Sequence, residues 1–178
     1  IANLGDVPAT LDYFQGSMYE AVEKIAEKYP DYIAYDFMGR STTYKKIVEQ
    51  INLFARALKA IGIREGDKIT ICMPNCPQTV IMFYAVNLVG GIANMIHPLS
   101  AEKEIEFYLN ASESTTAITL DQFYDKFEHI RQNTGIINII IASVKDALSR
   151  TTVSNTHFRV HETLRYHVSH LLLDHNIY

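Results

Sequence analysis

The sequence lacks tryptophan and contains only two cysteines, Cys72 and Cys76, among its 178 residues. Small secreted domains that depend on disulfides carry more cysteines than this. The low number predicts a reducing compartment, and we expect a cytoplasmic location. Long hydrophobic runs are missing as well, because the longest, near residues 80–89, is interrupted by Asn87. It is shorter than the roughly 18 apolar residues that a membrane-spanning helix needs, so we expect no transmembrane segment.

Positively charged residues are also fewer than negatively charged ones. The chain has 16 lysines and arginines against 20 aspartates and glutamates, which gives a formal net charge of -4. A surface without a basic field does not attract a phosphate backbone, so nucleic acid is not an expected partner. The first residues show neither the basic region nor the apolar core of a signal peptide. What the chain does have is a hydrophobic fraction of 48%, which is normal for a globular domain.

Two helices are predicted in the N-terminal third. Ser17 and Glu20 have the spacing of a capping box, and Pro30 ends the helix that they begin. The expected apolar face of this helix is Met18, Val22, Ile25 and Tyr29. A second helix starts near Thr43, and Gly62 is placed to end it. Its apolar stripe is Ile47, Ile51, Phe54, Leu58 and Ile61.

The rest of the ordered pattern has the rhythm of an α/β sheet. Residues 32–43 predict a small hairpin, and beyond residue 62 short apolar strands alternate with helices, which implies parallel pairing. The strands are expected at residues 68–73, 92–96, 115–120 and 136–141. The helices are expected at residues 79–89, from Ser100 and from Asp121. The predicted fold class is α/β, with a layered, mainly parallel sheet, helices on both faces and a small N-terminal hairpin.

Two of these helices carry more detailed expectations. The helix at residues 79–89 is apolar on nearly every side, which predicts burial all round. In the helix that Ser100 would cap, Ile105, Tyr108 and Leu109 are expected to face the core.

The composition divides the chain into three parts. Residues 1–16 are rich in turn formers and predict an extended lead-in, residues 17–148 form the α/β unit, and residues 149–178 form a histidine-rich tail of uncertain origin. The tail holds five of the seven histidines. His157 and His161 are four residues apart, a helical spacing that is used for zinc. No glutamate follows His157 as it would in a metalloprotease motif, so we favour a solvated or non-native tail over a metal site.

Three other sets of residues invite a functional interpretation. Cys72 and Cys76 could act as a nucleophile or as half of a metal site, but buried thiols are the more common case. His97 follows a predicted strand, and ligands in open α/β sheets bind beyond the carboxyl ends of strands. His97 is therefore a candidate for substrate contact, and a loop histidine with partners of its own is the alternative. The aromatic residues are candidates for an acyl tunnel, although core packing is favoured: they are Tyr13, Phe14, Phe123, Tyr124 and Phe127.

Several short segments occur in a characteristic order and spacing. They are TTY at residues 42–44, GDKI at 66–69, MPNCP at 73–77, LVGGIAN at 88–94 with HPL at 97–99, and EIEFYLN at 104–110. Together they resemble the N-terminal part of adenylate-forming enzymes, and specifically the acyl-CoA synthetases that act as long-chain fatty-acid–CoA ligases. The resemblance covers roughly residues 17–148. Lys46 departs from it, because the family signature has glutamate there, and His97 stands where the family usually has asparagine.

The resemblance implies a two-step reaction. A fatty-acid carboxylate attacks the α-phosphate of Mg-ATP to give an acyl adenylate and pyrophosphate, and the thiol of coenzyme A then displaces AMP. ATP, Mg2+ and coenzyme A would therefore be the cofactors of the parent enzyme, with a medium- or long-chain fatty acid as its substrate.

The parts that hold the nucleotide in this family have no counterpart in the chain. The phosphates need a Gly/Ser/Thr-rich loop with a lysine, and Gly90–Gly91 is followed by neither a lysine nor a hydroxyl cluster. We therefore expect no catalytic, cofactor-binding or metal-binding residues here, and no adenylation activity from this chain alone. The alternatives are a non-catalytic interaction module on the same scaffold and part of a peptide-synthetase adenylation domain. Uncovered apolar surface further predicts a homo-oligomer.

Overall fold

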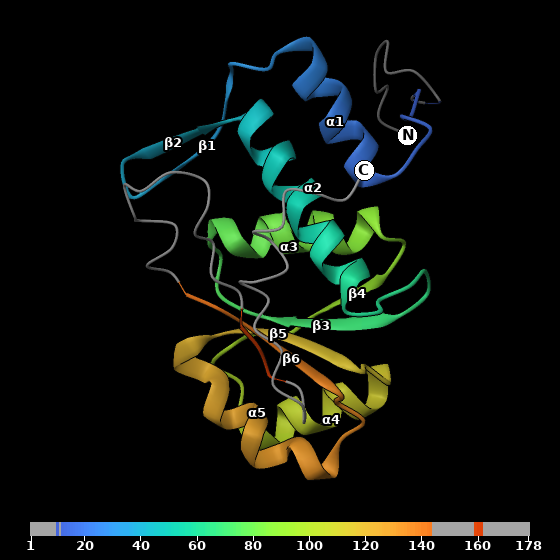
Figure 1. Cartoon of the computed structure of the whole chain (residues 1–178), viewed down its shortest axis with the longest axis vertical. Coiled ribbons are helices and arrows are strands. Elements are labelled where there is room, and N and C mark those ends of the chain that lie inside the picture. Colours follow the sequence, from blue (N-terminus) through green and yellow to red (C-terminus); the bar gives the residue numbers. More distant parts are fainter. Residues whose placement is uncertain (1–9, 11, 144–158, 162–178) are drawn as a thin grey trace, which may run out of the picture.

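The computed structural model describes residue 10, residues 12–143 and residues 159–161. In this part of the chain a mainly parallel sheet is covered by helices on both faces, and a separate hairpin lies beside the first helices (Figure 1). The predicted fold class is therefore confirmed. Most of the predicted lead-in and tail lies outside the described residues, including His157, His167, His170 and His175. No helix in the described part is long and apolar enough to cross a membrane.

Helix α1 (Met18–Lys28) begins as predicted but buries a different face. The Ser17 hydroxyl accepts the N–H of Glu20, and the Glu20 carboxylate accepts the N–H of Ser17, which completes the capping box. The predicted face is wrong, because Met18 and Ile25 are exposed while Tyr19 and Ala26 are buried.

The partners of Tyr19 explain this rotation. Its backbone N–H donates to Oδ1 of Asn87 at 2.9 Å, its hydroxyl donates to Glu23 at 2.8 Å, and the amide of Asn52 donates to that hydroxyl at 2.8 Å. The contacts with Asn52 and Asn87 fix which side of α1 faces helices α2 (Tyr44–Ala60) and α3 (Pro77–Leu88).

The predicted hairpin and second helix are both present. Strand β1 (Ile33–Phe37) pairs antiparallel with β2 (Arg40–Thr43), and helix α2 (Tyr44–Ala60) follows at once. The Thr43 hydroxyl caps α2 by accepting the N–H of Lys46 at 3.3 Å. The predicted stripe of α2 is buried except for Ile61, which follows the helix and is partly buried.

The large sheet has the strand order β4-β3-β5-β6-β7. Its strands are β3 (Lys68–Cys72), β4 (Ile92–Met95), β5 (Thr116–Leu120), β6 (Asn138–Ala142) and β7 (Arg159–His161). The first four in spatial order are parallel, as predicted, and β7 pairs antiparallel with β6. Strand β7 lies within the histidine-rich tail, where no strand was expected, and is therefore an addition to the expected sheet.

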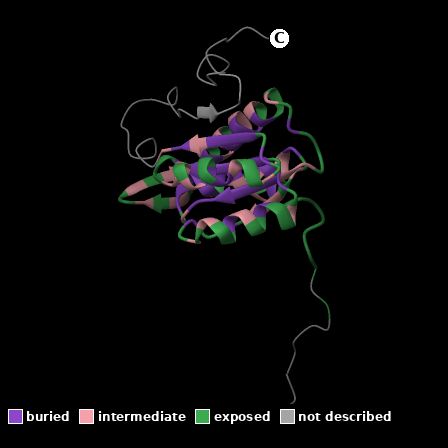
Figure 2. Ribbon diagram, turned by 90° about the horizontal axis from the view of Figure 1, so that it is seen from below, coloured by how far each residue is buried: buried purple, intermediate pink, exposed green. Residues whose placement is uncertain are grey.

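Two apolar clusters lie on opposite faces of this sheet. Residues of α1, α2 and α3 (Pro77–Leu88) pack on one face against side chains such as Ile71 and Ile118. Residues of α4 (Glu102–Ser112) and α5 (Tyr124–Ile130) pack on the other face against Cys72, Ala117 and Ile139. Figure 2 shows the buried strands between helices whose outer faces are exposed. Strands covered on both faces explain the almost uninterrupted apolar run in β6.

Three expectations about helices need correction. Helix α3 is not buried all round, since Val80 is exposed. The N-cap of α4 is Ala101 rather than Ser100, because Glu104 accepts the N–H of Ala101 at 3.2 Å. Tyr108 is exposed, because Ile105 and Leu109 already fill the core side of α4.

The chain after β5 also starts differently from the prediction. Asp121 opens a 3-10 turn, η1 (Asp121–Phe123), whose N-cap is Leu120, and α5 begins only at Tyr124. A second turn, η2 (Arg131–Asn133), follows α5.

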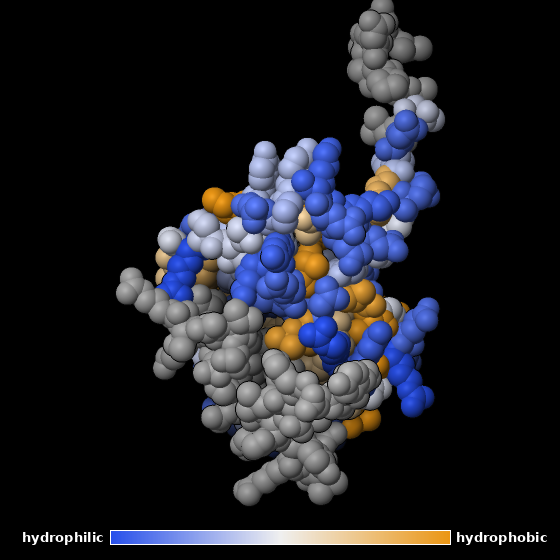
Figure 3. All heavy atoms as spheres, turned by 45° about the horizontal axis from the view of Figure 1, so that its top comes forward, coloured by the Kyte–Doolittle hydropathy of each residue, from blue (hydrophilic) through white to orange (hydrophobic). Residues whose placement is uncertain are grey.

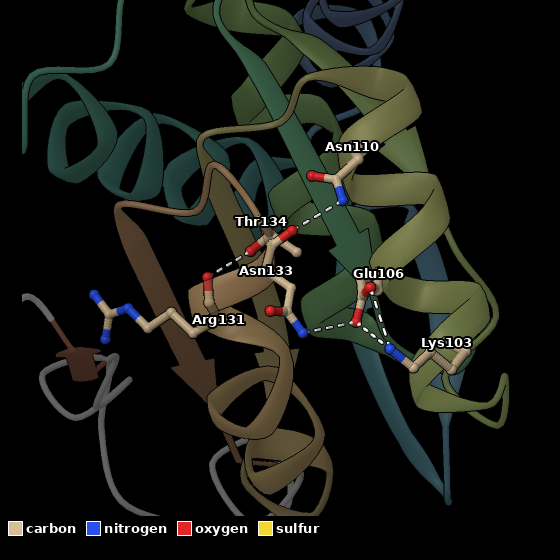
Figure 4. A network of polar contacts seen from close by, with 6 residues as sticks. All are labelled: Lys103, Glu106, Asn110, Arg131, Asn133 and Thr134. Atoms are coloured by element: carbon tan, nitrogen blue, oxygen red, sulfur yellow. Dashed lines mark hydrogen bonds and ion pairs between the residues drawn. The ribbon is translucent and has the colours of Figure 1, made fainter.

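A polar network joins α4 to η2 (Figure 4). The Glu106 carboxylate accepts from Nζ of Lys103 at 3.2 Å and from Nδ2 of Asn133 at 3.3 Å. Asn110 Nδ2 donates to the carbonyl of Asn133 at 3.0 Å, and Thr134 closes the turn by donating to the carbonyl of Arg131 at 3.0 Å. These contacts hold α4 and the end of α5 together over their shared face of the sheet.

Apolar side chains also reach the surface. Figure 3 shows an apolar area near the middle of one face, bordered by hydrophilic side chains. The large apolar residues that are exposed include Met18, Ile25, Ile33, Val80, Ile92, Met95, Leu99 and Phe107. Exposed apolar surface of this kind favours association.

Candidate functional site at the carboxyl edge of the sheet

The strand order creates a switch point between β3 and β5. Strand β3 leads into α3 on one face, and β5 leads toward α5 on the opposite face, although the two strands are neighbours. The connections therefore diverge at the carboxyl ends of these strands, which is where open α/β sheets bind ligands.

Polar side chains gather where strands β5 and β6 end. The Ser143 hydroxyl, directly after β6, donates to Oδ2 of Asp121, directly after β5, at 2.9 Å. Gln78, in the first turn of α3, donates from Nε2 to the Ser143 carbonyl at 3.0 Å. Its side chain is only 3% exposed, and Oε1 has no hydrogen-bond partner among the described residues.

Gln78, Asp121 and Ser143 were not expected to form a group. The position of Asp121 and Ser143 at the ends of predicted strands was the available signal. The contact with Gln78 depends on the crossover of α3 and was not visible in the sequence.

The start of α3 is a tightly bonded turn. The Thr79 hydroxyl donates to the Pro74 carbonyl at 2.6 Å and lies 3.3 Å from Sγ of Cys76. Cys76 is the N-cap residue but makes no side-chain cap bond. The burial that was expected for the Cys76 thiol is therefore confirmed.

Cys72 is the other buried thiol. It is fully buried at the end of β3, and burial raises the pKa of its thiol to about 11, an effect that the nearby Lys126 cation partly offsets. Its Sγ donates to the His97 carbonyl at 3.9 Å. A thiol that stays protonated at neutral pH is a poor nucleophile.

His97 is exposed at the carboxyl edge, in the loop after β4. Its Nδ1 accepts the N–H of Leu99 at 3.3 Å, so the neutral ring carries its proton on Nε2. Lys126 fixes this loop by donating from Nζ to the carbonyls of Pro98 at 3.1 Å and Ser100 at 2.8 Å. Because β4 is the outer neighbour of β3, His97 lies one strand away from the switch point.

The candidate aromatic residues do not line one common passage. Phe123 packs against the cluster on the α1–α3 face, whereas Tyr124 and Phe127 belong to the cluster on the α4–α5 face. Tyr13 and Phe14 are exposed, so the core packing expected for them is wrong. Phe14 instead lies under the Lys24 ammonium group, 4.4 Å from the ring centroid.

Gly90 and Gly91 do not form a phosphate cradle. They close α3, with the N–H of Gly90 bonded to the Asn87 carbonyl and the N–H of Gly91 bonded to the Val86 carbonyl. They precede β4 and therefore lie at the amino edge of the parallel strands. The N–H groups of Gly90 and Gly91 are therefore not free to bind the phosphates of Mg-ATP. In the described part of the chain, no group of three or more His, Cys, Asp or Glu residues could hold a metal ion.

The comparison with protein families decides the identity of this scaffold. The profile of the family described as AMP-binding enzyme matches residues 22–169. The chain belongs to this family. A long-chain-fatty-acid–CoA ligase of Bacillus subtilis is 33% identical over 143 residues, which is 80% of this chain and 26% of the ligase. The chain thus spans about a quarter of the length of its curated relatives.

Solved structures share the fold of this AMP-binding-family chain. A long-chain-fatty-acid–CoA ligase from Archaeoglobus fulgidus superposes with a TM-score of 0.70 and 23% identity, over 80% of this chain and 31% of that chain. A fused adenylation–PCP peptide-synthetase protein from Klebsiella oxytoca has a TM-score of 0.58 and 24% identity, over 60% of this chain and 20% of that chain. The resemblance to adenylate-forming enzymes is therefore confirmed at the level of sequence family and fold.

Proposed function

We propose that this chain is the N-terminal part of an ATP-dependent fatty-acid–CoA ligase. The observation that carries the proposal is the 33% identity to the Bacillus subtilis ligase across 80% of the chain. The whole enzyme would form an acyl adenylate from a medium- or long-chain fatty acid and Mg-ATP, release pyrophosphate, and pass the acyl group to the thiol of coenzyme A as AMP leaves.

Within such an enzyme, this chain would supply framework rather than nucleotide chemistry. The tight turn at Gly90–Gly91, the protonated thiol of Cys72 and the bonded thiol of Cys76 all support this role. The part that is shared with ligases would extend beyond the α/β unit of residues 17–148, because the family profile matches through residue 169 and β7 pairs with β6 in the large sheet. On its own the chain would not adenylate a fatty acid.

The first experiment measures fatty-acid-dependent release of pyrophosphate from ATP by this chain, with the Bacillus subtilis ligase as positive control. We expect turnover by the control and none by the chain. Turnover by the chain would refute the proposed framework role.

A second experiment asks whether the framework is that of a ligase. Residues 17–143 would replace the matching segment of the Bacillus subtilis ligase, and fatty acyl-CoA formation by the chimera would be measured. Activity would support the proposal. A chimera that folds, as shown by a single cooperative unfolding transition, but forms no acyl-CoA would favour the non-catalytic interaction module instead.

The same chimera tests the candidate substrate contact at His97. No described residue bonds Nε2 of His97, and the ring is exposed at the carboxyl edge of the sheet. We infer that this nitrogen donates to the bound substrate. His97→Ala is then expected to raise KM for the fatty acid about tenfold, the effect of losing one interaction of about 1.4 kcal/mol. His97→Asn, which keeps a donor, is the matched control and should retain most of the affinity.

The peptide-synthetase alternative rests on the likeness to the Klebsiella oxytoca adenylation protein. Residues 17–143 can be placed in that host in the same way. Adenylation by the peptide-synthetase chimera, together with failure of the ligase chimera, would favour this alternative.

A further inference from the structure

One edge of the large sheet is open. Strand β4 has β3 as its only neighbour in the described part of the chain. The N–H groups of Ile92 and Ile96 bond to the carbonyls of Asp67 and Ile71, so these residues turn their backbone groups toward β3. Because backbone groups alternate along a strand, Ala93 and Met95 turn theirs toward the open edge. The edge therefore presents two N–H and two C=O groups.

This edge lacks the features that normally prevent strands from pairing between molecules. Such features include charged side chains, proline and bulges. Strand β4 reads Ile-Ala-Asn-Met, with no charged residue and no proline, and it pairs with β3 in unbroken register.

The side chains along β4 complement a second copy of the same strand. Ala93 packs with the cluster on the α1–α3 face, which places Met95 on that face as well. Asn94 points to the other face, where its Nδ2 donates to Thr70 and Ser112 at 3.0 Å each. In an antiparallel pair centred on Asn94, the large, half-exposed Met95 of each copy would lie opposite the small Ala93 of the other copy.

We propose that two copies of this chain associate through β4, with the two strands antiparallel and a twofold axis at Asn94. In this register Ala93 of each copy exchanges both backbone hydrogen bonds with Met95 of the other, and all four outward groups are satisfied. The interface is isologous, as expected for a C2 dimer. The two sheets join into one continuous sheet, and the inference is independent of the proposed ligase function.

The surroundings favour a second copy over other occupants. The outward groups are symmetric about Asn94, so the strand is self-complementary. Lys68, which pairs in register with Ile92, forms an ion pair with Glu113 within the same copy.

The first test compares two identical substitutions. Met95→Lys places a charge on the open edge, whereas Met18→Lys makes the same change on α1 at nearly the same exposure, 53% against 50% for Met95. Sedimentation equilibrium would measure the dimer dissociation constant of the 178-residue chain and both variants. We expect a dimer for the parent chain and for Met18→Lys, and a dissociation constant at least about tenfold higher for Met95→Lys, equivalent to about 1.4 kcal/mol. A monomeric parent chain, or equal dissociation constants for both variants, would overturn the proposal.

A second test determines the register. Directly opposite residues in a non-hydrogen-bonded antiparallel pair have Cα atoms about 4.5 Å apart, within the range for a disulfide. Asn94→Cys should therefore cross-link to its own counterpart under mild oxidation, whereas Ile92→Cys should not, because residue 92 faces residue 96 of the partner. The buried Cys72 and Cys76 do not interfere. Cross-linking at 92 but not at 94 would contradict the proposed register.

Discussion

The loop that carries His97 depends on one lysine, and removing its charge gives a measurable prediction. Nζ of Lys126 donates to the carbonyls of Pro98 and Ser100 at 3.1 and 2.8 Å. A hydrogen bond to a charged group contributes about 1.5–3 kcal/mol when it is buried, but Lys126 is partly exposed and the freed carbonyls regain some water. We therefore expect Lys126→Met to lower the free energy of unfolding by about 1–2 kcal/mol.

The matched control is Lys103→Met. The Lys103 side chain is 82% exposed and bonds only to Glu106, three residues away on the same helix. Exposed pairs of this kind contribute about 0.3–0.5 kcal/mol. Urea denaturation would measure both variants, and the difference should appear in the midpoint with an unchanged slope.

Amide hydrogen exchange would localise the effect of Lys126→Met. The N–H of Ser100 bonds to the His97 carbonyl at 3.1 Å within the same loop, so its exchange should accelerate. If the two lysine variants have equal stability and exchange, Lys126 does not hold this loop and the account of the His97 environment is wrong.

Three further predictions concern the glycine turn, an ion pair and a thiol. A Cβ at Gly91 would lie 2.8 Å from Cδ1 of Ile69, so Gly91→Ala should destabilise by about 1–3 kcal/mol in thermal or urea unfolding, and a neutral variant would show that the turn is loosely packed. The carboxylate of Glu102, 3.0 Å away, raises the pKa of His129 by accepting its hydrogen bond. The stabilisation is present at low pH and is lost as pH rises through the raised pKa. An NMR titration of Glu102→Gln should therefore show a lower pKa for His129, and an unchanged pKa would contradict this. Burial raises the pKa of Cys72 to about 11, so thiol reagents should modify this thiol at pH 8 only after denaturation. The free energy of unfolding should fall as pH rises from about 9 toward 11, because only the unfolded thiol ionises in that range. Rapid labelling of the native chain at Cys72 would contradict this.

The sequence predicted the elements better than their faces. The stripe of α2 was found because Ile47, Ile51, Phe54 and Leu58 follow the helical period without competition. The face of α1 was missed because side chains distant in sequence, Asn52 and Asn87, bond to Tyr19 and turn the helix. Periodicity ranks faces by apolar content and contains no information about such partners.

The candidate site shows the same division. The position of His97 at the carboxyl edge and the burial of both thiols followed from strand ends and from residue type. The contact between Gln78 and Ser143 arises because α3 crosses over the sheet. The hydrogen bonds from Lys126 to the loop of His97 join residues that are 26 and 28 positions apart in the sequence. Neither contact has a local sequence signal.

The central claim is that this chain provides the framework of an adenylate-forming ligase without the parts that hold the nucleotide. Isothermal titration calorimetry of ATP into the chain, with and without Mg2+, tests it most directly, with the Bacillus subtilis ligase as positive control. We predict saturable heat for the ligase and none for the chain. Saturable, magnesium-dependent binding of ATP by the chain would contradict the account.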